Sequence, residues 1–143
     1  IAPDLREQDI HDVAAVAKEM QIDGLIATNT TISRPEHLTG RLSQEVGGLS
    51  GAPLRDMSTQ ILKSLYRSTE GKIPIIGVGG VFTGTDAYQK IRAGASLVQI
   101  YSAMIYRGPH AAKHIALELA SALAEDGFSN VAEAVGADSD KTG

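Results

Sequence analysis

The sequence predicts an α/β fold of parallel strands that alternate with helices, as in half of an eight-stranded barrel. Short apolar runs alternate with segments whose apolar residues recur at spacings of three and four. Such alternation is typical of a parallel sheet, because parallel neighbours need a long crossover. The runs are rich in Ile, Val and Leu, as expected for strands covered on both faces. Three strands are too few to close a barrel, and the competing prediction, a small doubly wound sheet, needs strand residues that the chain lacks.

The first half of the chain is expected to contain one helix, one strand and a long loop. Apolar spacing predicts a helix over residues 7–20, with Asp4 as its cap. Residues 22–28 form an apolar run of strand length that ends in the polar cluster 29–31. Residues 31–55 contain glycines and prolines without a sustained period, so they predict a long loop. Loops of this length in compact domains are usually functional.

Helices and strands also alternate in the second half of the chain. Glycines mark the ends of helices, where left-handed backbone is common, and a proline is tolerated in a first helical turn. The polar residues from Asp138 onward are expected to be disordered, which gives a partial barrel over residues 1–137 and a tail over 138–143. The predicted elements are a helix from Asp56 to Gly71, a strand over 73–78, a short helix opened by Thr85 or Asp86 and closed by Gly94, a strand over 96–101, a helix from Pro109 to Gly127, and a last helical turn over 131–135.

Composition and charge exclude several classes of function. The chain has 143 residues, of which 43% are hydrophobic and 21% charged, and this is the composition of one ordinary globular domain. A net charge of -4 gives no broad basic field, so we expect no nucleic-acid partner. The absence of cysteine excludes disulfides, thiolate metal sites and cysteine nucleophiles. The sequence contains no stretch of about 18 apolar residues, so it predicts no membrane-spanning helix.

The residues that follow the three predicted strands are the candidates for a binding site. In a parallel α/β barrel the site lies at the carboxyl ends of the strands. Here these ends are residues 28–30, 77–80 and 99–102, which should face one mouth. Paired glycines at 79 and 80 let main-chain N–H groups approach a phosphate, and residues 101–102 supply the second loop of such a site. The alternative to a phosphate site is that Gly79 and Gly80 only form a tight turn between the strand and the next helix.

Two other segments contribute candidates, and a third does not. Asn29 offers an amide donor and acceptor in fixed geometry for a carboxylate or an imide, although turn formation is an alternative role. Residues 49–51 can wrap a cofactor ring or phosphate, or form a mobile surface lid. His110 and His114 have the spacing of metal ligands on a helix, but no third ligand is evident, so we expect a solvated face and no metal site.

Five linked motifs cover nearly the whole chain in order. They are IAPDL at 1–5, DGLIATNTT at 23–31, GGLSG at 47–51, IIGVGGV at 75–81 and GASLVQIY at 94–101. Together they resemble the carboxyl-terminal half of the class 2, quinone-dependent dihydroorotate dehydrogenases. The resemblance implies an FMN-dependent (β/α)8 (TIM) barrel that oxidises dihydroorotate to orotate in pyrimidine biosynthesis and passes electrons to ubiquinone.

The resemblance also assigns roles to individual residues. Thr28 matches a flavin-contacting threonine, and Asn29 with Thr30 matches the substrate-binding pair. Ser50 and Gly51 match a loop that touches FMN. The phosphate of FMN is assigned to the backbone of Gly79 and Gly80 and to Tyr101 and Ser102.

Other parts of such an enzyme are expected outside this sequence. In the family the catalytic serine base, a flavin-contacting lysine and the helices of the quinone tunnel lie upstream of the position of Ile1. We therefore expect this chain alone to be inactive. The intact protein is expected at the mitochondrial inner membrane or, alternatively, at the cytoplasmic membrane of a bacterium. Two rival functions remain, namely a flavin-free phosphate-binding barrel enzyme and a non-catalytic half-barrel binding module.

Overall fold

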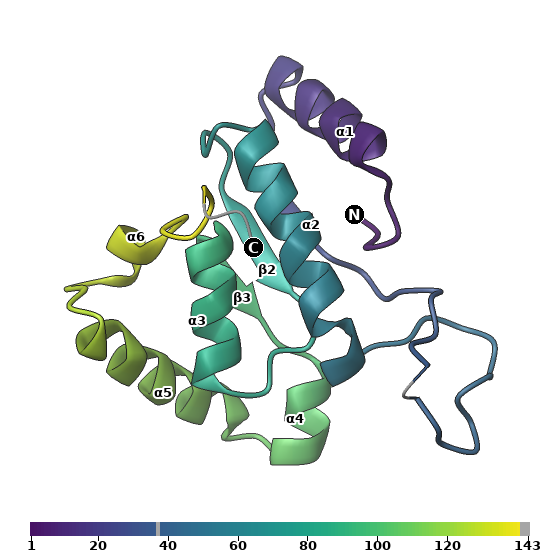
Figure 1. Cartoon of the computed structure of the whole chain (residues 1–143). Coiled ribbons are helices and arrows are strands. Elements are labelled where there is room, and N and C mark those ends of the chain that lie inside the picture. Colours follow the sequence, from purple (N-terminus) through teal and green to yellow (C-terminus); the bar gives the residue numbers. More distant parts are fainter. Residues whose placement is uncertain (37, 141–143) are drawn as a thin grey trace.

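The computed structural model describes residues 1–36 and 38–140, whose three strands form one parallel sheet (Figure 1). The sheet order follows the chain, and Ile26 pairs with Ile76, which in turn pairs with Leu97. Helices separate the strands in sequence, so the predicted alternation is confirmed. The strands are β1 (Leu25–Ala27), β2 (Ile75–Val78) and β3 (Leu97–Gln99).

Every predicted helix is present, and one helix was not predicted. The additional helix, α4, directly follows the third strand and has only six residues, which is too short for a spacing of apolar residues to reveal it. The described residues of the long segment between β1 and the second long helix confirm the predicted loop. The helices are α1 (Glu7–Glu19), a 3-10 turn η1 (Ala52–Leu54), α2 (Arg55–Ser68), α3 (Gly84–Ala93), α4 (Ser102–Arg107), α5 (Ala111–Glu125) and α6 (Val131–Ala134).

The predicted helix caps are wrong by a few residues. Helix α3 is capped by Thr83, whose hydroxyl accepts from Asp86 N–H, while the Asp86 carboxylate accepts from Thr83 N–H. This reciprocal box requires the cap to lie three residues before the acid, so neither Thr85 nor Asp86 is the cap. Helix α2 begins at Arg55, one residue before the predicted start at Asp56.

The Asp4 carboxylate caps no helix and instead anchors the segment after β1. Its Oδ1 accepts hydrogen bonds from Thr31 Oγ1 at 2.6 Å and from Ser33 Oγ at 3.0 Å. Helix α1 begins after Arg6. The long-range partners of Asp4 outcompete the local cap because two hydroxyl groups and one main-chain N–H converge on the same carboxylate.

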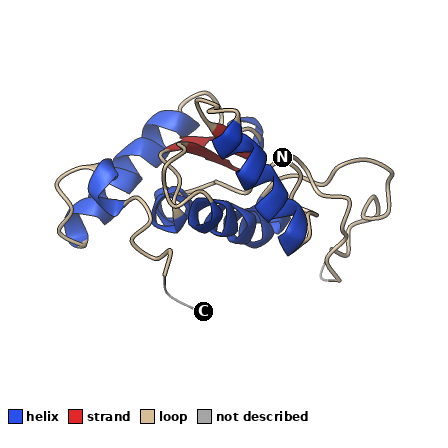
Figure 2. Ribbon diagram, turned by 90° about the horizontal axis from the view of Figure 1, so that it is seen from above, coloured by secondary structure: helices blue, strands red, loops and turns tan. Residues whose placement is uncertain are grey.

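Helices α2 and α3 cover one face of the sheet (Figures 1 and 2). Leu62 on α2 and Ile75 on β2 are fully buried in this layer. On the opposite face Ile26 is 51% exposed and Leu97 is 62% exposed. Within the described residues, the expectation that both faces are covered is therefore wrong.

The chain beyond α6 packs back onto α3. Asp138 N–H donates to Arg92 O at 2.9 Å, and the Arg92 guanidinium contacts the carboxylates of Asp126 and Asp138. Ser139 is buried. The expected disorder is therefore wrong for residues 138–140, while residues 141–143 of the predicted tail lie outside the described residues. No helix in the described part of the chain is long and apolar enough to span a membrane.

Candidate functional site

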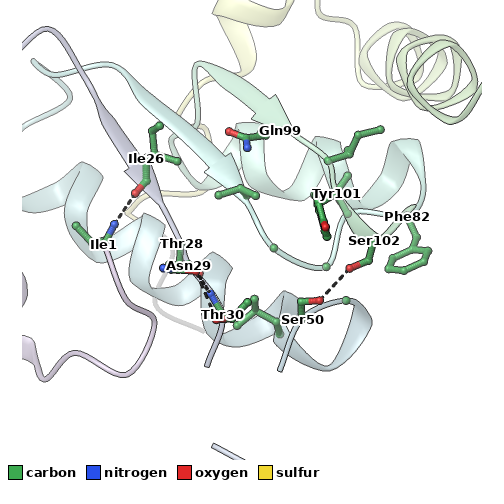
Figure 3. A pocket seen from close by; sticks show the side chains of 17 residues that line it. Ile1, Ile26, Thr28, Asn29, Thr30, Ser50, Phe82, Gln99, Tyr101 and Ser102 are labelled. Carbon is green, nitrogen blue, oxygen red and sulfur yellow. Dashed lines mark hydrogen bonds between the residues drawn. The ribbon is translucent and has the colours of Figure 1, made fainter. Parts of the chain in front are cut away.

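The carboxyl ends of the three strands open into one cavity of about 460 Å³ (Figure 3). Each residue that the sequence singled out for cofactor or substrate lies on its lining, although the roles assigned to them stay predictions. These residues come from four separate stretches of the chain, and the parallel register of the strands brings together the three that follow β1, β2 and β3. They are Thr28, Asn29, Thr30, Ser50, Gly51, Gly79, Gly80, Tyr101 and Ser102.

Two walls form the cavity. We call residues 78–82 and 99–102, which follow β2 and β3, the turn wall. We call residues 28–30 and 50–51, which belong to the segment after β1, the loop wall. The hydroxyl groups of Ser50 and Ser102 lie 3.1 Å apart and join the two walls (Figure 3).

The turn wall is built around two glycines that no other residue could replace without strain. Gly79 has a φ of +116° and Gly80 a φ of +71°, in the left-handed region. A Cβ atom on Gly80 would lie 2.4 Å from Cβ and 2.6 Å from Cα of Arg55. Among the described residues, neither glycine N–H donates a hydrogen bond within the protein. Two main-chain donors of the cavity lining are therefore available to an anion.

A carboxylate behind the turn wall stabilises its backbone. Asp86 Oδ2 accepts from the N–H groups of Phe82 and Thr83, both at 2.9 Å, and Oδ1 accepts from Arg55 Nη1 at 2.8 Å. Burial alone would raise the pKa of the Asp86 carboxyl, but these hydrogen bonds outweigh it and hold the pKa below its usual value. Asp86 is therefore a structural anion that fixes the end of the turn after β2.

A second ionisable group behind this wall escaped sequence reasoning. Lys90 on α3 is fully buried, and burial lowers its pKa to about 8, against the attraction of Asp86 and Asp56. A weak signal for it existed in the sequence. Lys90 lies three residues after Ala87 and next to Ile91, on the apolar face of the predicted helix, where a lysine is unusual.

The loop wall depends on main-chain contacts at its base. Thr31 and Leu49 form an isolated antiparallel bridge with N···O distances of 3.1 and 2.8 Å. The guanidinium group of Arg34 donates to the carbonyl oxygens of Glu45 at 2.8 Å and of Gly47 at 2.7 Å. The loop that these contacts close projects from the body of the molecule (Figure 1).

The residues after β1 present unused polar atoms to the cavity. Thr28 Oγ1 is buried, and no hydrogen-bond partner for it is found among the described residues. The Asn29 side-chain oxygen, Oδ1, accepts from Thr30 N–H at 2.7 Å, which leaves the side-chain NH₂ group outside that contact. Gly48 passes close over the Thr30 side chain, because a Cβ there would lie 1.9 Å from Thr30 Oγ1. The predicted turn role of Asn29 and a ligand-binding role are thus compatible.

The cavity can bind and orient a ligand, but its side chains offer little acid–base chemistry. Hydroxyl, amide and apolar groups line it, and its described residues include no carboxylate, imidazole or lysine side chain. His110 and His114 lie elsewhere, with ring centroids 6.3 Å apart. Within residues 1–36 and 38–140 no cluster of three or more potential metal ligands occurs.

Comparison with known proteins finds close relatives over most of the chain. A sequence model of the family described as dihydroorotate dehydrogenase matches residues 1–123. The mitochondrial dihydroorotate dehydrogenase (quinone) of Mus musculus is 56% identical over 138 residues, which are 96% of this chain and 35% of the mouse protein. The dihydroorotate dehydrogenase (quinone) of Azorhizobium caulinodans is 54% identical over 138 residues, 96% of this chain and 39% of that protein.

The structural comparison agrees with the sequence comparison. The crystal structure of DHODH from Eimeria tenella in complex with ferulenol matches with a TM-score of 0.94 and 51% identity. The match covers 96% of this chain and 36% of the Eimeria chain. This chain spans about a third of the length of the curated relatives it matches.

Proposed function

The chain belongs to the dihydroorotate dehydrogenase family, and from this premise we propose that it forms the flavin-binding carboxyl-terminal part of an enzyme that oxidises dihydroorotate to orotate. Its fold is part of a (β/α)8 barrel. The observation that carries the proposal is the convergence, in one cavity, of two unused glycine N–H groups and an unpartnered buried threonine hydroxyl. The proposed reaction belongs to pyrimidine biosynthesis, with a quinone, ubiquinone, as electron acceptor.

We propose FMN as the cofactor, because the cavity residues fit its two chemically different ends. The N–H groups of Gly79 and Gly80 and the Ser102 hydroxyl suit a phosphate, which accepts several hydrogen bonds at once. The buried hydroxyl of Thr28 needs an acceptor or donor that the described residues do not provide. FMN, when bound, supplies the two-electron redox chemistry that amino-acid side chains lack. The remaining proposed contacts to FMN are those of Ser50, Gly51 and Tyr101.

Asn29 and Thr30 are proposed to hold the substrate. Dihydroorotate carries a carboxylate and an imide, and the Asn29 NH₂ group can donate to either. The side-chain oxygen of Asn29 already accepts from Thr30 N–H, so the plane of the side-chain amide is fixed before the substrate arrives. The two serine hydroxyls of the cavity, Ser50 and Ser102, contact each other and are proposed to hold FMN. We therefore propose, from the family resemblance, that the proton leaving the substrate goes to a serine in a part of the enzyme outside this sequence.

Two locations are proposed for the complete enzyme. Relatives named mitochondrial favour the mitochondrial inner membrane, and bacterial relatives keep the cytoplasmic membrane as the alternative. In both cases the quinone, a membrane-soluble molecule, requires association with a membrane. The parts that approach the quinone are proposed to lie outside the present residues.

The visible spectrum of the complete enzyme tests the proposal directly. We expect a yellow protein that releases FMN on denaturation and converts dihydroorotate to orotate when a quinone is supplied. Replacement of Asn29 by Ala should raise the KM for dihydroorotate by about 10-fold or more and leave bound FMN in place. A colourless enzyme that turns over another phosphate-bearing substrate would instead identify a flavin-free barrel enzyme. A complete protein that binds no FMN and turns over no substrate would favour a non-catalytic binding module.

The 143-residue chain by itself should turn over no dihydroorotate. The reason is that the serine proposed to take the proton lies outside this sequence, and the cavity lining has no carboxylate, imidazole or lysine side chain to replace it. Turnover by the purified chain, measured by orotate formation, would contradict the placement of the base outside this sequence.

A further inference from the structure

Behind the turn wall, away from the cavity, a single ammonium group is connected to both glycines of the wall. Lys90 extends from α3 towards α2, where its Nζ donates to Ser58 Oγ at 2.8 Å and to Thr59 Oγ1 at 3.0 Å. Lys90 and Ser58 are each 0% exposed. A buried ammonium is costly unless its protons are used, and here two of them are.

Each of the two hydroxyl groups in turn donates a hydrogen bond to a main-chain carbonyl oxygen. Ser58 Oγ donates to Val78 O at 2.6 Å, and Thr59 Oγ1 donates to Arg55 O at 2.8 Å. An ammonium group has donors only, so each hydroxyl must accept from it and turn its proton away. The charge thereby fixes the direction of both hydroxyl–carbonyl hydrogen bonds.

The two carbonyl groups belong to residues that adjoin the glycine pair, one along the chain and one by packing against it. Val78 directly precedes Gly79, and a Cβ on Gly79 would lie 2.8 Å from Ser58 Oγ. Arg55 is the residue against which the Gly80 backbone packs. One arm of the network therefore supports each glycine whose N–H is proposed to bind phosphate.

We infer that Lys90 is a positioning residue for the cofactor phosphate, acting through Ser58 and Thr59 on the backbone of the Gly79–Gly80 turn. The inference rests on the proposed binding of FMN. Lys90 lies outside the cavity lining and acts on the ligand through the turn. Its effect should therefore be confined to the part of the ligand that the turn binds.

Comparison of FMN with riboflavin, which has no phosphate, separates this role from a general structural one. In the complete enzyme, Lys90→Met should weaken FMN binding by about 10-fold, the effect of a lost hydrogen-bonding network, and change riboflavin binding by less than about twofold. The melting temperature should stay the same or rise, because methionine fills the site without burying a charge. Lys72→Met is the matched control, since Lys72 is exposed and lies before the opposite end of β2, and it should change nothing.

A double substitution tests whether the residues act as one network. Ser58→Ala should also weaken FMN binding selectively, and Lys90→Met with Ser58→Ala together should weaken it little more than either alone. Fully additive losses would show two independent effects and overturn the inference. So would FMN affinities for both single variants within twofold of the wild-type value.

The pH dependence provides a second readout. The charged groups that act on the Lys90 ammonium are Asp86 on its own helix and Asp56 and Arg55 on α2, while β2 carries no titratable residue. With a pKa of about 8, Lys90 loses its proton in the folded apoenzyme before it does in the unfolded chain. FMN affinity should therefore fall as pH rises above about 8, whereas stability should rise with pH between 8 and the usual value of 10.5.

Lys90→Met should show neither trend. A wild-type FMN affinity that stays constant from pH 7 to 9.5 would overturn the inference. If the wild-type enzyme binds no FMN at all, the proposed cofactor fails and the inference with it. If wild type and variants bind FMN equally, only the inference fails.

Discussion

The two walls of the cavity face the same ligand space but are stabilised in different ways. The turn wall is supported from behind by buried charged groups, with Asp86 7% exposed and Lys90 fully buried. The loop wall is continuous with a segment whose apolar side chains lie largely in the open, such as Ile32, which is 80% exposed, and Val46. The Arg34 guanidinium, which donates to two carbonyl oxygens, and the main-chain bridge between Thr31 and Leu49 hold that segment.

The difference suggests a division of labour between the walls. A cofactor that stays bound benefits from donors held rigidly in place, because little ordering is required when it binds. A substrate that enters and leaves needs a wall that opens at low cost, and segments with few buried contacts open most easily. The proposed FMN phosphate contacts of Gly79 and Gly80 lie on the turn wall. The loop wall carries the proposed substrate contacts, together with Thr28, Ser50 and Gly51, which are proposed to contact other parts of FMN.

The largest expected effect comes from adding one methyl group to the turn wall. Gly80→Ala places a Cβ against the Arg55 backbone at a positive φ, so the turn must shift. We expect FMN affinity to fall by about 100-fold and the free energy of unfolding by about 2–3 kcal/mol. Titration of the apoenzyme with FMN and denaturant unfolding measure the two.

Gly40→Ala is the control, since nothing lies within 4 Å of its Cβ position. Equal losses of FMN affinity and of stability for the two variants would contradict the claim that the turn wall is the more tightly packed of the two walls.

Asp86→Asn should have the next largest effect. It removes a buried charge that two N–H groups and Arg55 share, so we expect a loss of about 2 kcal/mol in the free energy of unfolding at neutral pH. Because the folded pKa of Asp86 lies below its usual 3.8, this contribution is present above pH 3.8 and disappears as pH falls through the folded value. Wild type and variant should therefore converge in strong acid.

Asp56→Asn provides the matched comparison for that substitution. Asp56 also contacts Arg55, but its side chain is 85% exposed. Exposed ion pairs contribute little, so stability should be nearly unchanged at every pH. Denaturant unfolding at several pH values measures both variants. Equal losses for the two carboxylates would contradict the claim that burial makes Asp86 important.

The smallest global effect is expected in the loop wall. Arg34→Met removes the donors to Glu45 O and Gly47 O, but little buried apolar surface. Hydrogen exchange of the Leu49 amide, which donates to Thr31 O, should accelerate by about 10-fold, while the melting temperature shifts by less than about 2 °C. Arg41→Met, at an exposed position of the same loop, should leave exchange unchanged. A melting temperature that falls as far as for Gly80→Ala would show that the loop segment contributes as much to global stability as the turn wall does.

Much of this organisation could be predicted from local sequence. The apolar runs that became β1, β2 and β3 have strand length and end in glycine or small polar residues, and the parallel topology brings those ends to one edge. Local signals also placed the long loop and the main helices. They fail for α4, whose six residues are too few for a period, and for the cap of α3, which is Thr83.

The sequence by itself determined where strands end and which small or polar residues follow them, because these features depend on neighbours along the chain. Only the tertiary structure decided which polar atoms are satisfied and which remain for a ligand. Ser58 and Lys90 are 32 residues apart, as their hydrogen bond shows, and neither carries a local mark of that partnership. Burial and hydrogen bonding depend on contacts between distant segments, so they were decided when α2 and α3 packed together behind the glycine turn.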